Sequence, residues 1–352
     1  MTITAEHETT TAGAAWPLPG ITRAEAERLF AALAAALGQD GREGPADQPA
    51  DSVPATAAPT PAPVSVSSGE AAVDVAAAEL VERVRPAAPV VAIMGPLRVV
   101  GAAGDAPVAR STGTASEAQT QRCAALAAFL ALYPGASAEA YTAAFWPGER
   151  ADGPAAAASR NKLSGQLRRY LGQDGDGVPY FPRLRADGYR LHEAVTTDWQ
   201  TFCGLVGSEP SRASTPALVG ALRLVRGAPF EHARPRNIGW ADDLHRDMVE
   251  AITAAAFELG ARAEVAGCVG HRQLAARVAR TVDPSCEAAW RASVAAEAAA
   301  GAREEVSRLV EGLYAYLGAV EAEPEAETTE LVARLRAQGY RMGMGWEGLA
   351  GS

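Results

Sequence analysis

The stretch SRNKLSGQLRRYLG, residues 159–172, concentrates four cationic side chains and no acidic one in a segment with a helical pattern. If Leu163 is set at 0° and each residue advances by about 100°, apolar and polar residues separate onto two faces. One face holds Ala156, Leu163, Leu167, Tyr170 and Leu171, and the other holds Asn161, Lys162, Gly165, Arg168 and Arg169. Arg can bind guanine and Asn can bind adenine, whereas Lys and Arg also hold phosphates. The cationic face therefore predicts contact with double-stranded DNA.

The elements before this segment fit the order of a winged helix-turn-helix. VVAIMGPLRVVG, residues 90–101, is β-rich and predicts two short strands joined by a turn at Gly95–Pro96. Residues 116–135 predict an amphipathic helix that Ser116 can cap, and Ser137 can cap a shorter helix that ends at Pro147–Gly148. In such a unit the second helix enters the major groove of DNA. Here the cationic helix occupies that second position.

A wing is predicted after the cationic helix. Residues 178–191 indicate two strands around Asp187–Gly188, and Pro179 and Pro182 demote the first of them to an edge strand. The wing adds three further cations that could touch the DNA backbone: Arg183, Arg185 and Arg190.

A run of Lys and Arg on a helix is more commonly just a solvated face. Two observations favour DNA contact here: the face has no interleaved acid, and the wing adds cations, although the chain has 42 acidic and 32 basic residues and a net charge of −10. Gly165 is costly inside a helix, so it either permits close approach to the duplex or reflects neutral drift.

Other kinds of chemistry lack a motif. The five histidines have no metal-binding spacing, and HExxH, GxxxxGK[ST] and GxSxG are absent, so we expect no enzyme activity, no metal and no cofactor. The four cysteines lie far apart without a CxxC pair, and no apolar run reaches the length of a membrane span. These features predict a cytoplasmic protein with reduced thiols and no membrane partner.

The chain divides into four predicted regions. Residues 1–88 form an N-terminal extension with a helix at 22–38, a Pro/Ala-rich disordered linker at 39–69 and a short helix at 70–85. Residues 89–194 form the winged helix, 195–340 form a stack of α-hairpins, and 341–352 form a tail. The predicted helices of the stack are roughly 214–226, 240–266, 270–282, 285–299, 302–317 and 325–337. The expected fold class is mainly α with a small β component.

Several stretches together resemble SARP-type transcriptional regulators. They are GPLRVVG, AFWPG, SRNKLSGQLRRYLG, DGYRL, TTDWQTFCGLV, ALRLVRGAPF and LGAVEAEPEAETTELVARL. In that family an OmpR-type winged helix precedes a bacterial transcriptional activation domain (BTAD) of tetratricopeptide-like helices. The resemblance covers about residues 90–338, and the WPG variant is most similar to the BTAD type at the C-terminal end of multidomain membrane-anchored relatives.

The resemblance implies a sequence-specific regulator of transcription, an activator that recruits RNA polymerase and binds direct repeats as side-by-side protomers. Double-stranded DNA, RNA polymerase and a second copy of the chain are the implied partners. Carried over to this chain, the recognition helix is 155–171 and the wing is 178–191. The candidate contacts are Arg160, Asn161, Lys162, Ser164, Gln166, Arg168 and Arg169, with Arg183, Arg185 and Arg190 in the wing. Arg160 lies near the apolar arc, which indicates either a phosphate contact or a structural pair.

A second hypothesis is a protein-interaction adaptor whose winged helix no longer binds DNA and whose α-hairpin stack binds a partner. The acidic net charge and Gly165 favour it, and the acid-free cationic face disfavours it. Residues 22–38 could dock onto the helical module, pair with themselves in a dimer or recruit another molecule. DNA binding by the cationic helix discriminates between the two hypotheses.

Overall fold

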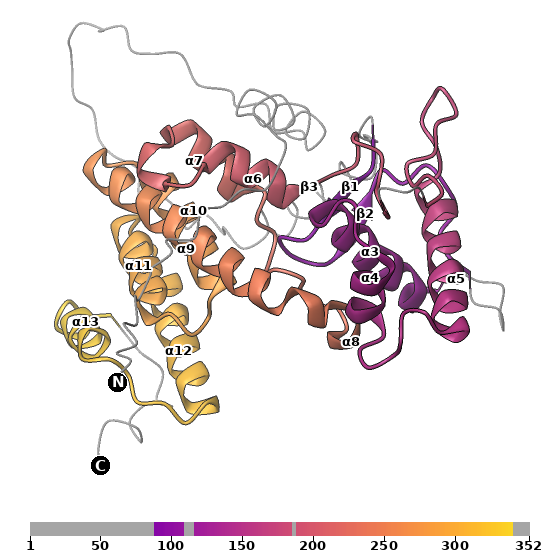
Figure 1. The fold of residues 1–352 in the computed structure, drawn as a ribbon. Helices are drawn as coiled ribbons and strands as arrows, with labels where there is room; N and C mark the ends of the chain where they lie inside the picture. Colours follow the sequence, from indigo (N-terminus) through magenta and orange to yellow (C-terminus); the bar gives the residue numbers. More distant parts are fainter. Residues whose placement is uncertain (1–87, 109–115, 185–187, 341–352) are drawn as a thin grey trace, which may run out of the picture.

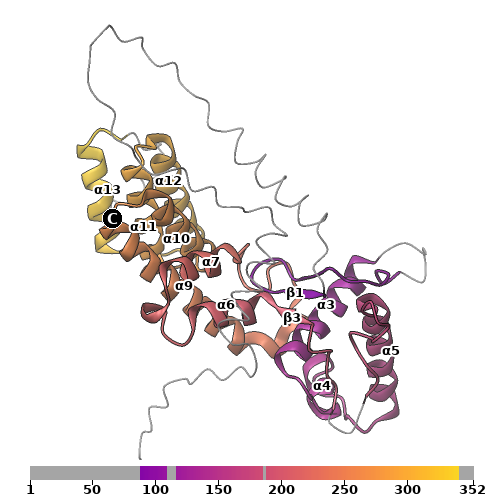
Figure 2. The same ribbon diagram turned by 90° about the horizontal axis from the view of Figure 1, so that it is seen from above.

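The computed structural model describes residues 88–108, 116–184 and 188–340. Its helices and small sheet confirm the predicted class, mainly α with a small β component (Figure 1). Helix α5 (Pro154–Leu171) lies at one end of the molecule, and α12 (Arg303–Ala319) and α13 (Ala326–Ala337) lie at the other, as two views agree (Figures 1 and 2). The helices predicted at 22–38 and 70–85 lie outside the described residues.

A three-stranded sheet stands at the start of the described chain. Strands β1 (Val90–Ala92) and β2 (Arg98–Val100) pair antiparallel, with Val91 opposite Val99, which confirms the two strands and turn predicted at 90–101. Strand β3 (Thr196–Thr197) pairs parallel with β1 and gives the order β2-β1-β3. The sequence did not predict β3, because two residues are too few to show an alternating pattern.

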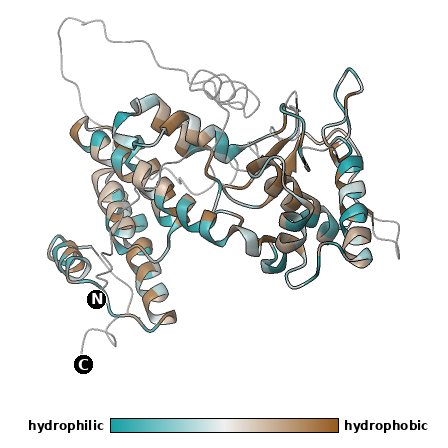
Figure 3. Cartoon of the chain, viewed as in Figure 1, coloured by the Kyte–Doolittle hydropathy of each residue, from teal (hydrophilic) through white to brown (hydrophobic). Residues whose placement is uncertain are grey.

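Helices α3 (Glu117–Leu132) and α4 (Ala138–Phe145) precede α5, in the order that the sequence predicts. Helix α3 is buried on all sides from Cys123 to Leu132 because its small alanines allow the sheet and α5 to pack closely. In the cartoon of Figure 3 much of α3 is coloured as hydrophobic, whereas α5 carries hydrophilic residues. As predicted, Ser137 caps α4, accepting a hydrogen bond from the Ala140 amide at 3.2 Å.

The segment predicted as a two-stranded wing departs from a regular hairpin. Tyr189 bridges Ala136 instead of a partner within 178–184, and its amide donates to the Ala136 carbonyl at 2.9 Å. The predicted strand ladder is therefore wrong for the described residues. Residues 185–187, the tip that includes Arg185 and Asp187, lie outside them.

Prolines explain why the first half of this wing forms no strand. Pro179 and Pro182 carry no N–H and remove two donors from a seven-residue stretch. A hydrogen bond from the His192 amide to the Tyr180 carbonyl, at 2.8 Å, still holds the two halves together at their base. The described parts of the wing are thus irregular and anchored on the domain core.

The second half of the chain is the predicted stack of α-hairpins. Its helices are α6 (Asp198–Val206), α7 (Thr215–Arg223), the short α8 (Pro235–Ile238), α9 (Asp242–Val265), α10 (Val269–Val282) and α11 (Glu287–Ala299), followed by α12 and α13. From α9 to α12 each helix packs on the next. Gly267 and Gly301, with positive φ of 65° and 75°, follow the ends of α9 and α11, where a helix C-terminus favours glycine.

A buried carboxylate joins the two halves. Both oxygens of Asp198 accept hydrogen bonds from β1–β2 turn amides, Ile93 at 2.8 Å and Met94 at 3.2 Å. Arg226, which follows α7, forms an ion pair with the same carboxylate. Burial raises the pKa of Asp198, while Arg226 and the amide donors oppose that shift. One side chain therefore fixes the sheet, α6 and the segment after α7 to each other.

A second junction lies between α3 and the start of α9. Trp240 packs its ring against Phe129 of α3, with centroids 5.3 Å apart, and against Phe230 at 5.9 Å. The Phe230 amide also donates to the Ile93 carbonyl at 2.8 Å. One hydrophobic cluster consequently runs from the sheet to α10, and a separate cluster joins α11, α12 and α13. Among the described residues no helix is both long and apolar enough to cross a bilayer.

Candidate nucleic-acid interface

The sequence of α5 explains both where the helix starts and where it stops. Pro154 occupies the first turn, where its missing N–H costs nothing, and an alanine run at 155–158 follows. Arg168 and Arg169 lie in the last turn, where positive charge interacts favourably with the helix dipole. Gly172 then adopts a φ of 76° and ends the helix.

The loop after β2 closes the C-terminal end of α5. The Ala103 amide donates to the Leu171 carbonyl and the Gly104 amide to the Tyr170 carbonyl, both at 3.1 Å. A Cβ at Gly104 would stand 1.8 Å from the Arg169 carbonyl oxygen, so only glycine fits. This contact leaves the long outward side of α5 uncovered while it fixes the helix end on the domain.

The outward face of α5 presents a cationic surface without acids. Asn161, Lys162 and Arg169 are exposed, and neither cation has an ion-pair partner within the described part of the chain. A Cβ at Gly165, on the same face, would meet nothing within 4 Å. The face can therefore accept a flat or convex polyanion directly against the helix backbone.

Arg160 lies on the opposite, inward side of α5. It is buried, with 7% of its surface exposed, and its guanidinium donates to the Thr142 hydroxyl of α4 and, at 2.9 Å, to the Ala151 carbonyl. The Thr142 hydroxyl in turn donates to the Ala138 carbonyl at 2.7 Å. Of the two interpretations of Arg160, the structure contains the structural pair: the side chain fixes the angle between α4 and α5.

Ser164 and Gln166 are also engaged within the fold. Ser164 is buried, and its hydroxyl lies 3.5 Å from the Tyr141 hydroxyl. The Gln166 amide donates to the Gln119 side chain of α3 at 2.7 Å. Both residues therefore brace α5 against α3 and α4.

Arg168 connects α5 to the wing. Its guanidinium donates to the Phe181 carbonyl at 2.8 Å and the Pro182 carbonyl at 3.2 Å, and it lies 5.1 Å from the centre of the Phe181 ring. Partial burial lowers the pKa of Arg168, and the nearby positive charge of Arg183 lowers it further. Arg183 and Arg190 are exposed on the wing beside this contact.

Two acidic residues near α5 are held in the turns at its two ends. Asp152, before the helix, pairs with Arg150 at 2.9 Å. Asp174, after the helix, accepts hydrogen bonds from the amides of Asp176 and Val178, at 3.0 and 2.8 Å. This arrangement is a plain turn, and it keeps both acids off the face that carries Lys162.

The sequence missed the residues that support the site. Polar side chains of α5 donate hydrogen bonds to Thr142, to Gln119 and to the Phe181 carbonyl. These three partners lie outside α5, and no sequence motif marks them. One signal was present: Arg160 falls beside the apolar arc of the projection, which is where a buried cation must sit. Its partner could not be found in the same way, because the pairing joins different helices.

Comparisons with known proteins give little beyond this geometry. No protein-family model matches the chain, and no curated protein matches it. Among solved structures the chain is similar to Mycobacterium tuberculosis EmbR in complex with a low-affinity phosphopeptide, at 19% sequence identity and a TM-score of 0.44. That match covers 71% of this chain and 65% of the EmbR chain. At this level the similarity does not identify what the chain does.

Proposed function

We propose that this protein is a transcription regulator that binds double-stranded DNA through the outward face of α5. The observation that carries the proposal is the exposed, acid-free surface of Asn161, Lys162 and Arg169 at one end of the molecule, on the second helix of a helix-turn-helix unit. Such a helix fits the major groove of B-DNA. The acidic remainder of the chain then limits nonspecific binding.

The side chains of α5 divide into three proposed roles. Asn161 reads a base edge, because it is exposed and an amide can bind adenine with two hydrogen bonds. Lys162 and Arg169 hold phosphates on either side of it. Arg168 positions the wing, whose Arg183, Arg185 and Arg190 contact adjacent phosphates. A last group is left out of the proposed contacts because each of its members makes a hydrogen bond inside the fold, namely Arg160, Ser164 and Gln166.

The α-hairpin module is proposed to contact RNA polymerase or a neighbouring copy of the chain on adjacent DNA repeats. These are the partners that the resemblance to SARP-type regulators implies, and an activator needs both a DNA-binding and a protein-binding surface. The junction at Asp198 supports these two separate roles, because it would hold the DNA-binding surface and the protein-binding surface in a fixed relative orientation.

The test is selection of bound duplexes from a random pool by the full chain at low salt, followed by binding titrations. Wild-type protein is expected to enrich one sequence, and Asn161→Ala to lose about 1–3 kcal/mol of discrimination at one base position. Lys162→Ala should instead weaken binding to all sequences and reduce the salt slope by about 0.9. Failure to bind any duplex at low salt would remove the proposal.

An interaction adaptor is the second candidate, favoured by a groove in the helical module bounded by α9, α10, α11 and α13. Under this alternative the winged helix is only a scaffold. Two substitutions distinguish the candidates, Lys162→Ala and Arg169→Ala. An adaptor would bind its partner protein equally well with either one, whereas a DNA-binding regulator would lose DNA affinity.

A further inference from the structure

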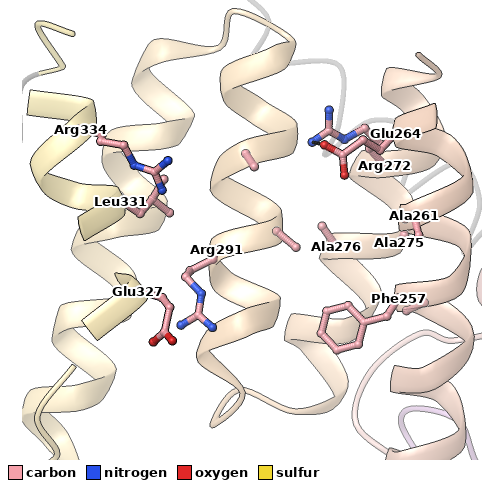
Figure 4. A pocket seen from close by; sticks show the side chains of 14 residues that line it. Phe257, Ala261, Glu264, Arg272, Ala275, Ala276, Arg291, Glu327, Leu331 and Arg334 are labelled. Carbon is pink, nitrogen blue, oxygen red and sulfur yellow. Dashed lines mark ion pairs between the residues drawn. The ribbon is translucent and has the colours of Figure 1, made fainter. Parts of the chain in front are cut away.

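A groove runs across the helical module at the end of the molecule away from α5. Helices α9 and α13 form its two sides, and α10 and α11 form its floor (Figure 4). Its volume is about 500 Å³. The groove belongs to none of the surfaces proposed for DNA.

The floor and sides of this groove are complementary to bulky apolar side chains. Small residues leave the space open, with Gly260 and Ala261 on α9, Ala276 on α10, and Ala292 and Ala295 on α11. Two larger apolar residues face the space, namely Phe257 on α9, which is 39% exposed, and Leu331 on α13. An exposed aromatic ring beside an alanine floor is an unfavourable surface to leave in water.

Charged side chains of both signs stand along the rim. Arg272 pairs with Glu264 at 3.6 Å, and Arg291, at the other end of the groove beside Glu327, pairs with Glu325 at 2.5 Å (Figure 4). Arg334 of α13 has no ion-pair partner in the described ranges. A ligand with an apolar stripe flanked by charges of both signs would therefore fit this rim.

The chain itself contains a segment of that kind outside the described residues. TRAEAERLFAALAAALG, residues 22–38, has a helical pattern whose apolar stripe consists of Ala26, Leu29, Phe30, Leu33 and Leu37. A helix of this length is about 25 Å long, and α9, with 24 residues, offers a side about 36 Å long. Residues 22–38 carry two glutamates, Glu25 and Glu27, and two arginines, Arg23 and Arg28, so their mixed charge matches a rim that carries both signs.

The intervening chain can cover the path along α9 to the groove: α9 starts at Asp242, next to the Trp240 that packs against Phe129, and its groove residue Gly260 is about 27 Å further along the helix. Forty-nine residues connect Gly38 to Ala88, and Ala88 packs beside the sheet that the Asp198 junction joins to α6. As the linker that their composition predicts, residues 39–69 span about 28–33 Å on average, and the helix predicted at 70–85 adds about 24 Å. Tethering at this distance gives an effective concentration on the order of millimolar, so even a weak interaction is populated.

We propose that residues 22–38 dock in cis into the groove between α9, α10, α11 and α13, with Leu29, Phe30 and Leu33 seated on the alanine floor. The docked segment covers Phe257 and Leu331. Any partner protein that uses the same groove must first displace it. This inference does not depend on DNA binding, because α5 lies at the other end of the molecule.

The test places a photo-crosslinking benzoylphenylalanine at position 30 of the full chain and maps the products by mass spectrometry. Cross-links to α9 or α13 at the mass of one chain are expected. The matched control carries the same group at position 28, on the opposite face of the predicted helix, and is expected to give little product. Phe257→Ala should reduce the yield from position 30 by roughly tenfold, whereas Val265→Ala, at an exposed position of α9, should not.

Three results would overturn the inference. Equal yields from positions 28 and 30 would mean that the apolar stripe is not what docks. Cross-links elsewhere, or none, would mean that the segment does not use this groove. Cross-links in the groove at twice the chain mass would assign the groove to the segment of a second copy.

Discussion

The two ends of the molecule differ in how several of their cations are paired. Ion pairs at the helical end join Arg262 with Glu258, Arg272 with Glu264, Arg291 with Glu325, and Arg308 with Glu305. On the outward face of α5, Lys162 and Arg169 have no acidic partner within the described ranges. A cation that is already paired gains little from a phosphate, whereas an unpaired one gains most. The net charge of −10 therefore conceals one end where the exposed Lys162 and Arg169 have no ion-pair partner among the described residues.

The two ends keep a fixed position relative to each other only if the domains are joined firmly, and Asp198 is the residue that joins them. Asp198→Ala leaves two buried amides and Arg226 without their acceptor. We expect the free energy of unfolding to fall by about 3–5 kcal/mol, because one partner of a buried ion pair is removed. Urea denaturation followed by circular dichroism measures this. A loss below about 1 kcal/mol would show that the junction tolerates separation.

Within the α5 end, Arg160 is expected to behave unlike the outward cations. Arg160→Ala leaves the Ala151 carbonyl unpaired and opens a gap beside α4, so the unfolding free energy should fall by about 2–3 kcal/mol. The loss appears in a thermal melt without DNA. Unchanged stability together with weaker DNA binding would instead return Arg160 to the group of direct contacts.

The outward cations should show the reverse behaviour. Replacing Lys162 and Arg169 together by alanine is expected to weaken DNA binding by roughly ten- to a hundredfold and to lower the salt slope by about 1.8, with stability unchanged. Replacing Arg223 and Arg277, exposed cations of the helical module, removes the same charge as a control. Fluorescence anisotropy with the selected duplex measures both. Equal losses in the two double variants would mean that total charge alone governs binding.

Gly165 gives the smallest expected effect. A methyl group fits there without contact, so Gly165→Ala should stabilise α5 by about 0.5–1 kcal/mol. The thermal melt tests the gain, and the DNA titration separates the two interpretations of this glycine. Unchanged affinity indicates neutral drift, and reduced affinity indicates that the duplex approaches the backbone at this point.

Much of the local structure could be predicted because it depends on short-range rules. The cap at Ser137, the helix end at Gly172, and the helix breaks at Gly267 and Gly301 follow from backbone preferences that any single stretch displays. Strand β3 and the irregular wing could not be predicted, because each depends on a partner far away in the sequence. Tyr189, for example, pairs with Ala136 rather than with its expected neighbour.

By itself the sequence determined which residues of 155–171 share a face, since a helical period of 3.6 residues leaves no alternative. Only the tertiary structure decided which polar residues of that helix are used inside the protein. Arg160 and Arg169 are the same residue type on one helix, yet Thr142 and Ala151 hold the first and the second remains exposed. The physical reason is that hydrogen-bond partners come from other elements, and their positions are fixed only when the helices pack.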